Sequence, residues 1–184
     1  MNTIIEEKKA MRKSMLHARN SLNSLLEQKY SNWICAQLEI LIINSNSKSV
    51  HAYIPISNEI DISPLLQKLL DSNITVICPK TLPKRKLENR ILHSLNQLET
   101  GIMGTKHPLQ ADIYQELIDF IIIPGLAFDK KKFRLGCGGG YYDNFLINHP
   151  KAQKVGIFFP FQQVDIVPTE PHDIHLDTIL VKEF

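Results

Sequence analysis

The chain has 184 residues, of which 43% are hydrophobic and 22% charged, and its formal net charge is +2. These values are typical of a globular protein, and so small a charge favours neither a nucleic-acid nor a membrane partner. The N-terminal segment has no signal-peptide core, no apolar run approaches the ~20 residues of a membrane span, and the three cysteines form no CxxC pair. We therefore expect one cytoplasmic domain over residues 1–184, acting as a monomer.

The first elements along the chain are predicted to be helices. Residues 4–22 have apolar side chains at a helical period, and a second helix is expected to begin near Ser24. Ser24 and Glu27 have the spacing of a capping box at that start. The polar stretch 44–49 ends the helix. Its expected apolar face comprises Leu26, Tyr30, Trp33, Ile34, Leu38 and Leu41.

The middle of the chain reads as strands around a short helix. Residues 49–56 and 73–79 are predicted strands, and 91–95 is a weaker third. Between the first two strands, Ser63 is expected to cap a helix that has Pro64 at its first position and ends near Leu70.

The last third alternates between the two kinds of element. Residues 114–129 are predicted to form a short helix followed by a buried strand at 118–124. A helix is predicted at 141–148, and further strands at 154–159 and 177–181. The alternation indicates an α/β fold, a three-layer Rossmann-like domain with a mostly parallel sheet. Ligands bind beyond the carboxyl ends of such strands, so the loops after 49–56, 118–124 and 154–159 are the candidate sites.

One of these loops carries RLGCGGGYYD at residues 134–143, which holds four of the chain's eight glycines. The segment fits either a plain tight turn or a backbone that lies against a phosphate at a helix N-terminus. It is neither a Walker A motif nor a dinucleotide fingerprint. The flanking Arg134 and Asp143 favour an anion site, in which Asp143 either holds Mg²⁺ or complements the helix dipole.

Other polar residues allow a functional and a plain interpretation. Lys8 and Arg12 are four residues apart on one helix face, which suits either solvent or a polyphosphate. Glu59 follows a strand end, where it is solvated or holds the N–H groups of a heterocycle. His172 and Asp173 are candidate metal or substrate ligands in what is otherwise a surface loop. The basic clusters at 80–90 and 130–134 are expected to be mostly surface charge, with a few members facing an anionic ligand.

Together these segments resemble the 5-formyltetrahydrofolate cyclo-ligase (methenyltetrahydrofolate synthetase) family over nearly the whole chain. The most specific part is PGLAFDKKKFRLGCGGGYYDNFL at residues 124–146. The family's early basic pair resembles Lys8 and Arg12. Its segment that ends in a glutamate resembles residues 53–59, and its late aspartate resembles Asp173. The chain departs from the family at Cys137 and Gly139, where members often carry basic or aromatic side chains.

The resemblance implies an ATP-dependent cyclisation of 5-formyltetrahydrofolate to 5,10-methenyltetrahydrofolate, through a phosphorylated formyl oxygen and with release of ADP and phosphate. It implies Mg²⁺ as the cofactor, held by Asp143 and Asp173, folate contacts from Ile54, Glu59 and Tyr142, and catalytic roles for Arg134 and Tyr142. The implied ATP contacts are Lys8, Arg12, Arg134, Leu135, Gly136, Cys137, Gly138, Gly139, Gly140, Tyr141 and Tyr142.

Two other classes of protein stay open from the residues alone. One is a sugar-phosphate or acyl-transfer enzyme on a similar sheet, and the other is a non-catalytic folate- or nucleotide-binding module. We also expect Cys137 to be the most reactive of the three thiols, because the glycine loop and Arg134 would favour its thiolate. Cys35 and Cys78 lie in apolar segments and are expected to be buried and inert.

Overall fold

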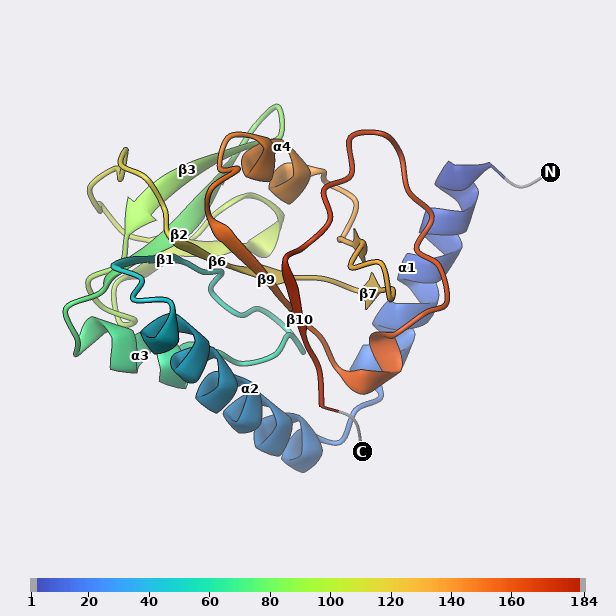
Figure 1. Ribbon diagram of the computed structural model, residues 1–184, viewed down its shortest axis with the longest axis horizontal. Helices are drawn as coiled ribbons and strands as arrows, with labels where there is room; N and C mark the ends of the chain where they lie inside the picture. Colours follow the sequence, from blue (N-terminus) through green and yellow to red (C-terminus); the bar gives the residue numbers. More distant parts are fainter. Residues whose placement is uncertain (1–2, 183–184) are drawn as a thin grey trace.

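The computed structural model describes residues 3–182, which form a central sheet of six strands with helices on both faces (Figure 1). The strand order is β10-β9-β6-β1-β2-β3. All neighbours in this order are parallel except β2 and β3, which are antiparallel. The strands are β1 (Ser49–His51), β2 (Thr75–Leu82), β3 (Lys86–Ile91), β6 (Phe120–Pro124), β9 (Gln153–Ile157) and β10 (Thr178–Leu180). The expected α/β fold with a mostly parallel sheet is confirmed.

The core lies on both faces of the sheet because side chains alternate along each strand. In β6, Phe120 and Ile122 pack toward α2 (Ser24–Asn44) and α3 (Ser63–Leu70), whereas Ile121 and Ile123 pack toward α4 (Tyr141–Ile147). All four side chains are fully buried. This strand therefore shows the continuous apolar run that is typical of a parallel sheet covered on both sides.

The first helix, α1 (Ile4–Asn20), stands at one end of the sheet beside the short strand β7 (Ala127–Phe128) (Figure 1). Met11 and Met15 of α1 pack on Ala127 and on Leu135 of β8 (Arg134–Leu135). This packing fixes the helix over the segment that runs into the glycines. The remaining elements are the hairpin β4 (Leu98–Thr100) and β5 (Lys106–Pro108), with the 3₁₀ turns η1 (Ile102–Gly104) and η2 (Pro160–Gln162).

The helix caps differ from the predicted ones. Asn23, not Ser24, caps α2, because its side chain accepts hydrogen bonds from the backbone N–H groups of Leu25 and Leu26. Leu26 is 62% exposed and does not belong to the apolar face. At α3 the cap position is Ile62 and Ser63 is the first helical residue, while Pro64 lies in the first turn as helix geometry allows.

Three strand and helix predictions were wrong in extent. The first strand ends at His51 rather than at residue 56, and no helix forms at 114–117, where Ile113 just before this segment pairs with Arg90 of β3. The third strand covers 86–91 instead of 91–95. It follows a turn with positive φ at Lys84 and Arg85, without the glycine or asparagine that normally marks such a turn.

A histidine is buried in the core below α4. His51 of β1 is fully buried and stacks on Phe145, with ring centroids 4.5 Å apart. Burial, and to a lesser degree the nearby His149, lowers the pKa of His51 to about 3. The ring is therefore neutral in the folded protein at any ordinary pH.

This neutral histidine predicts acid sensitivity. An unfolded histidine binds a proton below about pH 6.5, whereas folded His51 does not until its own lower pKa, so stability falls as the pH drops between these values. Between pH 6.5 and 5 this one group should cost about 2 kcal/mol. The free energy of unfolding, measured in urea for the wild type and for His51→Leu at pH 7 and pH 5, checks this prediction. The variant should lose less stability on acidification, and an equal loss would contradict the assignment.

Among residues 3–182, no helix combines the length and the apolar character that a membrane crossing requires.

Candidate active site

A pocket of about 600 Å³ opens at the carboxyl ends of the central strands. Its walls come from the segment after β1, from β2, from the end of β6, from α1 and from the glycine segment. All residues that the sequence singled out for ATP, folate and Mg²⁺ line this one pocket. The loop after β9 also reaches it, through Glu170, His172 and Asp173, while Phe159 and Gln162 at the start of that loop line a small recess behind it. All three loops expected to hold the site therefore do so.

The glycine segment is held between two arginines. Arg12 of α1 donates from Nε to the carbonyl oxygen of Gly136 at 2.9 Å, and a Cβ at Gly138 would lie 3.3 Å from that guanidinium. Gly140, the N-cap of α4, lies against Arg85, whose Cδ would be 3.5 Å from an added Cβ. Gly138 and Gly140 also have φ of 105° and 66°, which favour glycine. The glycines thus allow both the backbone path and the close approach of the two cations.

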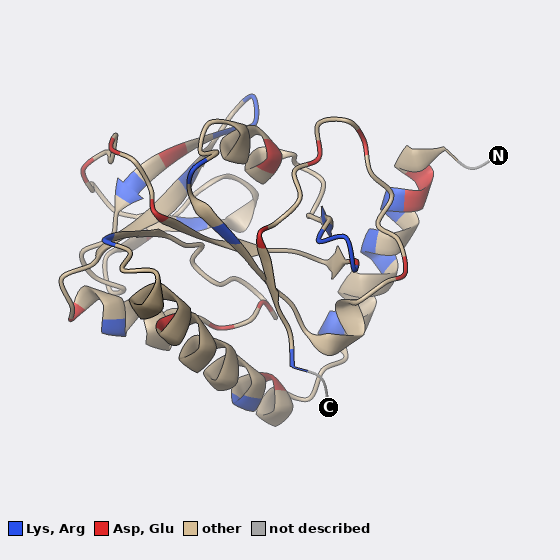
Figure 2. Ribbon diagram, in the orientation of Figure 1, with Lys and Arg blue, Asp and Glu red and all other residues tan. Residues whose placement is uncertain are grey.

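Lys8 is held by two carboxylates from the loop after β9. Its Nζ lies 2.6 Å from Asp173 Oδ2 and 2.9 Å from Glu170 Oε2, and acidic residues of this loop run beside the basic face of α1 (Figure 2). Burial alone would lower the pKa of Lys8, but the hydrogen bonds to Asp173 and Glu170 outweigh it and raise the pKa. Lys8 is therefore charged, and any phosphate that binds it competes with these two groups.

Arg134 and Asp143 form the other buried ion pair of the pocket. Arg134 Nη1 lies 3.1 Å from Asp143 Oδ1 and also donates to the carbonyl oxygen of Ile174 at 3.1 Å. The backbone N–H of Ile174 donates to the same Asp143 oxygen at 3.3 Å. Asp143 and Asp173 thus lie on segments that are joined at Ile174.

These two carboxylates bear on metal binding. Within residues 3–182, no three His, Cys, Asp or Glu side chains are grouped so that they could hold a metal ion. Mg²⁺ commonly keeps several waters and binds one or two carboxylates together with substrate phosphates. Asp143 and Asp173 fit that mode of binding, in which the nucleotide supplies the remaining ligands.

The other end of the pocket, formed by the segment after β1, carries an apolar side chain and a carboxylate. Ile54 is buried there, and Glu59 closes a turn in which its Oε2 accepts the backbone N–H of Ile56 at 3.2 Å. Burial raises the pKa of Glu59, although the N–H of Ile56 and the charge of Arg19 act in the opposite direction. A group that offers N–H donors would satisfy this carboxylate.

Tyr142 lies between the two ends of the pocket. Its hydroxyl is enclosed and has no hydrogen-bond partner among the described residues. Burial, and then the nearby Glu59, raises the pKa of Tyr142 far above its ordinary value. The phenol stays protonated, so it can donate a hydrogen bond to a ligand but cannot act as a base.

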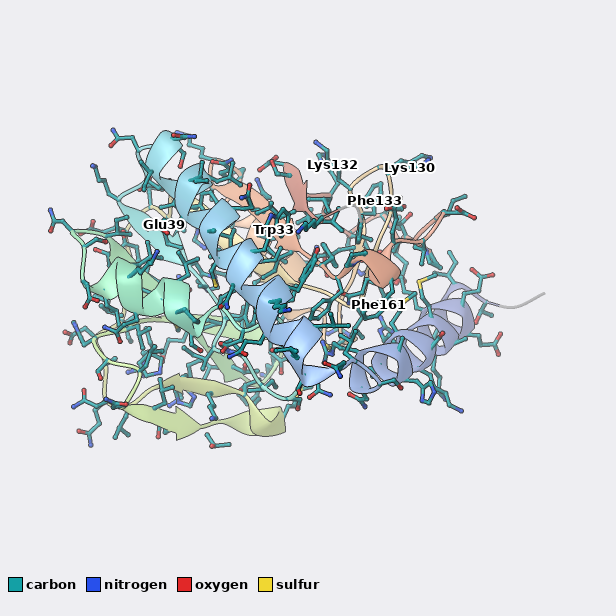
Figure 3. All side chains as sticks on the ribbon, turned by 90° about the horizontal axis from the view of Figure 1, so that it is seen from below. Trp33, Glu39, Lys130, Lys132, Phe133 and Phe161 are labelled. Atoms are coloured by element: carbon teal, nitrogen blue, oxygen red, sulfur yellow. The ribbon has the colours of Figure 1, made fainter. Side chains whose placement is uncertain are left out.

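Sequence reasoning missed several residues of this pocket, among them Arg19, Arg85 and Lys106. Arg19 follows Arg12 by seven residues, or two turns along the same face of α1, and this spacing could have identified it. Arg85 belongs to the basic cluster at 80–90, of which a few members were expected to face an anionic ligand. Neither Arg85 nor Lys106 could be singled out, because the turn after β2 and the β4–β5 hairpin were not predicted. Figure 3 shows Lys130 and Lys132 pointing outward, so of the basic cluster at 130–134 only Arg134 faces the pocket.

The three cysteines are buried or exposed as expected, but the pKa of one of them differs from the expectation. Cys35 and Cys78 are buried and Cys137 is exposed on the glycine segment. Loss of solvation, and then the charge of Glu59, raises the pKa of Cys137, although Arg19 and Arg12 oppose the effect. The expectation that this position favours a thiolate was wrong, because the pocket wall desolvates the sulfur more than the two arginines stabilise its charge.

Known proteins are similar to this chain in sequence and in fold. A model of the 5-formyltetrahydrofolate cyclo-ligase family matches residues 4–182. The 5-formyltetrahydrofolate cyclo-ligase of Haemophilus influenzae is 31% identical over 98% of this chain and 100% of its own length, and that of Mycoplasma pneumoniae is 31% identical over 96% and 99%. The solved structure of Aquifex aeolicus 5,10-methenyltetrahydrofolate synthetase aligns with a TM-score of 0.81 and 32% identity, over 95% of this chain and 89% of that one.

The chain belongs to the 5-formyltetrahydrofolate cyclo-ligase family.

Proposed function

We propose that this chain cyclises 5-formyltetrahydrofolate to 5,10-methenyltetrahydrofolate and converts ATP to ADP and phosphate. One observation carries the proposal. A single pocket joins a glycine segment that is flanked by arginines to an end that holds Ile54 and the carboxylate of Glu59. The first end suits a polyphosphate and the second suits a heterocycle with N–H donors.

The reaction needs activation of a poor electrophile. The formyl oxygen attacks the γ-phosphorus of ATP, and ADP leaves. N10 then attacks the formyl carbon and loses its proton, and the C–O bond breaks to release phosphate. Phosphoryl transfer depends mainly on positioning and on charge stabilisation, so no covalent intermediate with the protein is required.

The phosphate end uses backbone and cations together. Arg12 and Arg85 form no ion pair with any described residue, so both are available to a nucleotide that lies on the glycine segment. Lys8 would exchange part of its contact with Glu170 and Asp173 for phosphate oxygens. Arg134 is held by Asp143 and would stabilise charge on the transferred phosphoryl group. Residues 135–142 contribute mainly backbone N–H groups.

The folate end uses Ile54 as an apolar wall and Glu59 as an acceptor for pterin N–H groups. Tyr142 lies where the two substrates meet and would donate a hydrogen bond to an oxygen of the reacting group. Asp143, with Asp173 beside it, would hold Mg²⁺, which neutralises charge on the phosphates when it is bound.

The proposed working unit is a monomer of one domain in the cytoplasm. Size-exclusion chromatography with light scattering tests the oligomeric state, and a specific activity that rises with protein concentration would contradict a monomer.

The decisive test measures ATP turnover with and without 5-formyltetrahydrofolate while the absorbance of the methenyl product is followed. We expect one ADP for each methenyltetrahydrofolate formed. ATP turnover at the same rate with and without the folate would point to another transferase. Binding of ATP or the folate without turnover would point to a non-catalytic module. Either result would overturn the proposal.

The exposed thiol gives a separate check on where the nucleotide binds. Iodoacetamide should label Cys137 before Cys35 or Cys78, but more slowly than a free thiol at pH 7.5, because the pKa of Cys137 is raised. ATP with Mg²⁺ should slow the labelling further by covering the glycine segment. Peptide mapping with and without the nucleotide measures both effects, and equal rates in the two samples would place the phosphates elsewhere.

A further inference from the structure

Near the end of α1, Arg19 is a buried arginine without a partner. It is 8% exposed, its Nε is fully enclosed with no hydrogen-bond partner, and its guanidinium forms no ion pair within residues 3–182. The other buried cations of the pocket, Lys8 and Arg134, are both paired with carboxylates. An unpaired buried charge is costly, so its presence in a pocket wall points to a ligand that supplies the missing acceptor.

The position of Arg19 narrows the kind of ligand group. It lines the main pocket and also the small recess behind it, in both places together with Tyr53, Glu59 and Gly125. Its positive charge reaches Glu59, yet the two side chains form no ion pair with each other. A cation and a carboxylate therefore face the same end of the pocket side by side, each with capacity left for a ligand.

The edge of a pterin ring matches this pair. The 4-oxo oxygen is an acceptor, and the neighbouring N3–H and 2-amino groups are donors. Glu59 can accept from both donors, which leaves the adjacent oxygen in need of a donor if it is to be buried. Tyr53 cannot serve, because its hydroxyl already donates to the carbonyl oxygen of Ile60 at 2.6 Å.

We propose that Arg19 donates a hydrogen bond to the 4-oxo oxygen of the pterin while Glu59 accepts from the neighbouring N–H groups. This inference rests on the proposed function and adds to it a specificity-determining residue. The pocket then recognises the order of acceptor and donors along the ring edge, and it selects a 4-oxo pterin over its 4-amino counterpart, which presents a donor to the guanidinium.

The test uses calorimetric binding to the full chain. Wild type, Arg19→Met and Arg19→Lys are compared with three ligands: 5-formyltetrahydrofolate, its 4-amino counterpart, and 5-formyl-6-methyltetrahydropterin, which lacks the aminobenzoylglutamate tail. We expect Arg19→Met to raise the Kd for both 4-oxo ligands at least tenfold and to abolish the preference over the 4-amino ligand. The Kd values of Arg19→Lys for the 4-oxo ligands should lie between those of the wild type and of Arg19→Met, because lysine keeps the charge but lacks the planar guanidinium.

Stability separates this role from a structural one. Loss of an unpaired buried charge should leave the melting temperature of ligand-free Arg19→Met equal to or above that of the wild type, whereas loss of a structural contact would lower it. The affinity for ATP should be unchanged in both variants. A variant that melts lower and binds ATP less tightly would show that Arg19 supports the fold, which would overturn the proposal.

The remaining outcomes are equally decisive. A loss confined to the ligand with the tail would place Arg19 on the tail carboxylates, and a loss rescued at pH 8.5 would mean that it acts only through the ionisation of Glu59. Unchanged binding would also overturn the proposal. If the wild type binds ATP but neither 4-oxo ligand, the proposed function itself fails. That result differs from the one that overturns only the role of Arg19, in which the wild type binds the 4-oxo ligands and Arg19→Met binds them equally well.

Discussion

Glu59→Gln should raise the KM for 5-formyltetrahydrofolate by about tenfold to a hundredfold and leave the KM for ATP nearly unchanged. A hydrogen bond to a charged group contributes about 1.5–3 kcal/mol, and each 1.4 kcal/mol corresponds to a factor of ten. The amide of glutamine can accept one pterin N–H but presents its own NH₂ group to the second donor. Steady-state kinetics with each substrate varied in turn measures the two constants.

The same pocket offers a matched control. Glu170 is also a carboxylate of the pocket wall, but it holds Lys8 at the phosphate end. Glu170→Gln should therefore change the KM for ATP and not that for the folate. If both variants changed both constants equally, the division of the pocket into two ends would be wrong.

The pH profile gives a further signature of Glu59. Because burial raises its pKa, the carboxyl takes up a proton at a higher pH than an ordinary glutamate does. Only the ionised form accepts from both pterin donors, so the wild-type KM for the folate should rise as the pH falls through that pKa. Glu59→Gln cannot titrate and should lose this part of the dependence.

The fold could be predicted from the sequence where local patterns and burial agree. The apolar run of β6 and the strand–helix alternation gave the parallel sheet, because a strand buried on both faces needs such a run. The helix predicted at 114–117 failed for a tertiary reason. Tyr114 donates its backbone N–H to the carbonyl oxygen of Asn89, and this pairing with β3 takes the start of the segment out of a helical conformation.

The site could be predicted where it lies on one stretch of chain. The glycine segment and Asp143 are read directly from neighbouring letters, and Lys8 and Arg12 from their spacing. The place of Arg85 in the site could not be predicted, because its approach to Gly140 depends on an unusual turn between β2 and β3. The raised pKa of Cys137 could not be predicted for a related reason. It depends first on the loss of solvation in the pocket wall and then on the charge of Glu59, and both arise only through the fold.

Asp143→Asn should lower kcat by about 10–100-fold and raise the Mg²⁺ concentration that gives half-maximal activity. An amide oxygen is a weaker Mg²⁺ ligand than a carboxylate, so excess Mg²⁺ should restore part of the rate. The change also removes the charge partner of Arg134, whose side chain is only 3% exposed. Activity titrated with Mg²⁺ at saturating ATP and folate measures the effect.

The two consequences of this substitution can be separated. If Asp143 only positions Arg134, activity falls but the Mg²⁺ requirement stays as in the wild type. If it holds the metal, the requirement rises and ATP without Mg²⁺ binds to both proteins alike. Asp177→Asn is the matched control, because Asp177 pairs with Lys154 at 3.6 Å and does not line the pocket. Its Mg²⁺ titration should overlay that of the wild type. An Asp143→Asn curve with a lower maximum but the same half-maximal Mg²⁺ concentration would leave Asp143 as the partner of Arg134 alone.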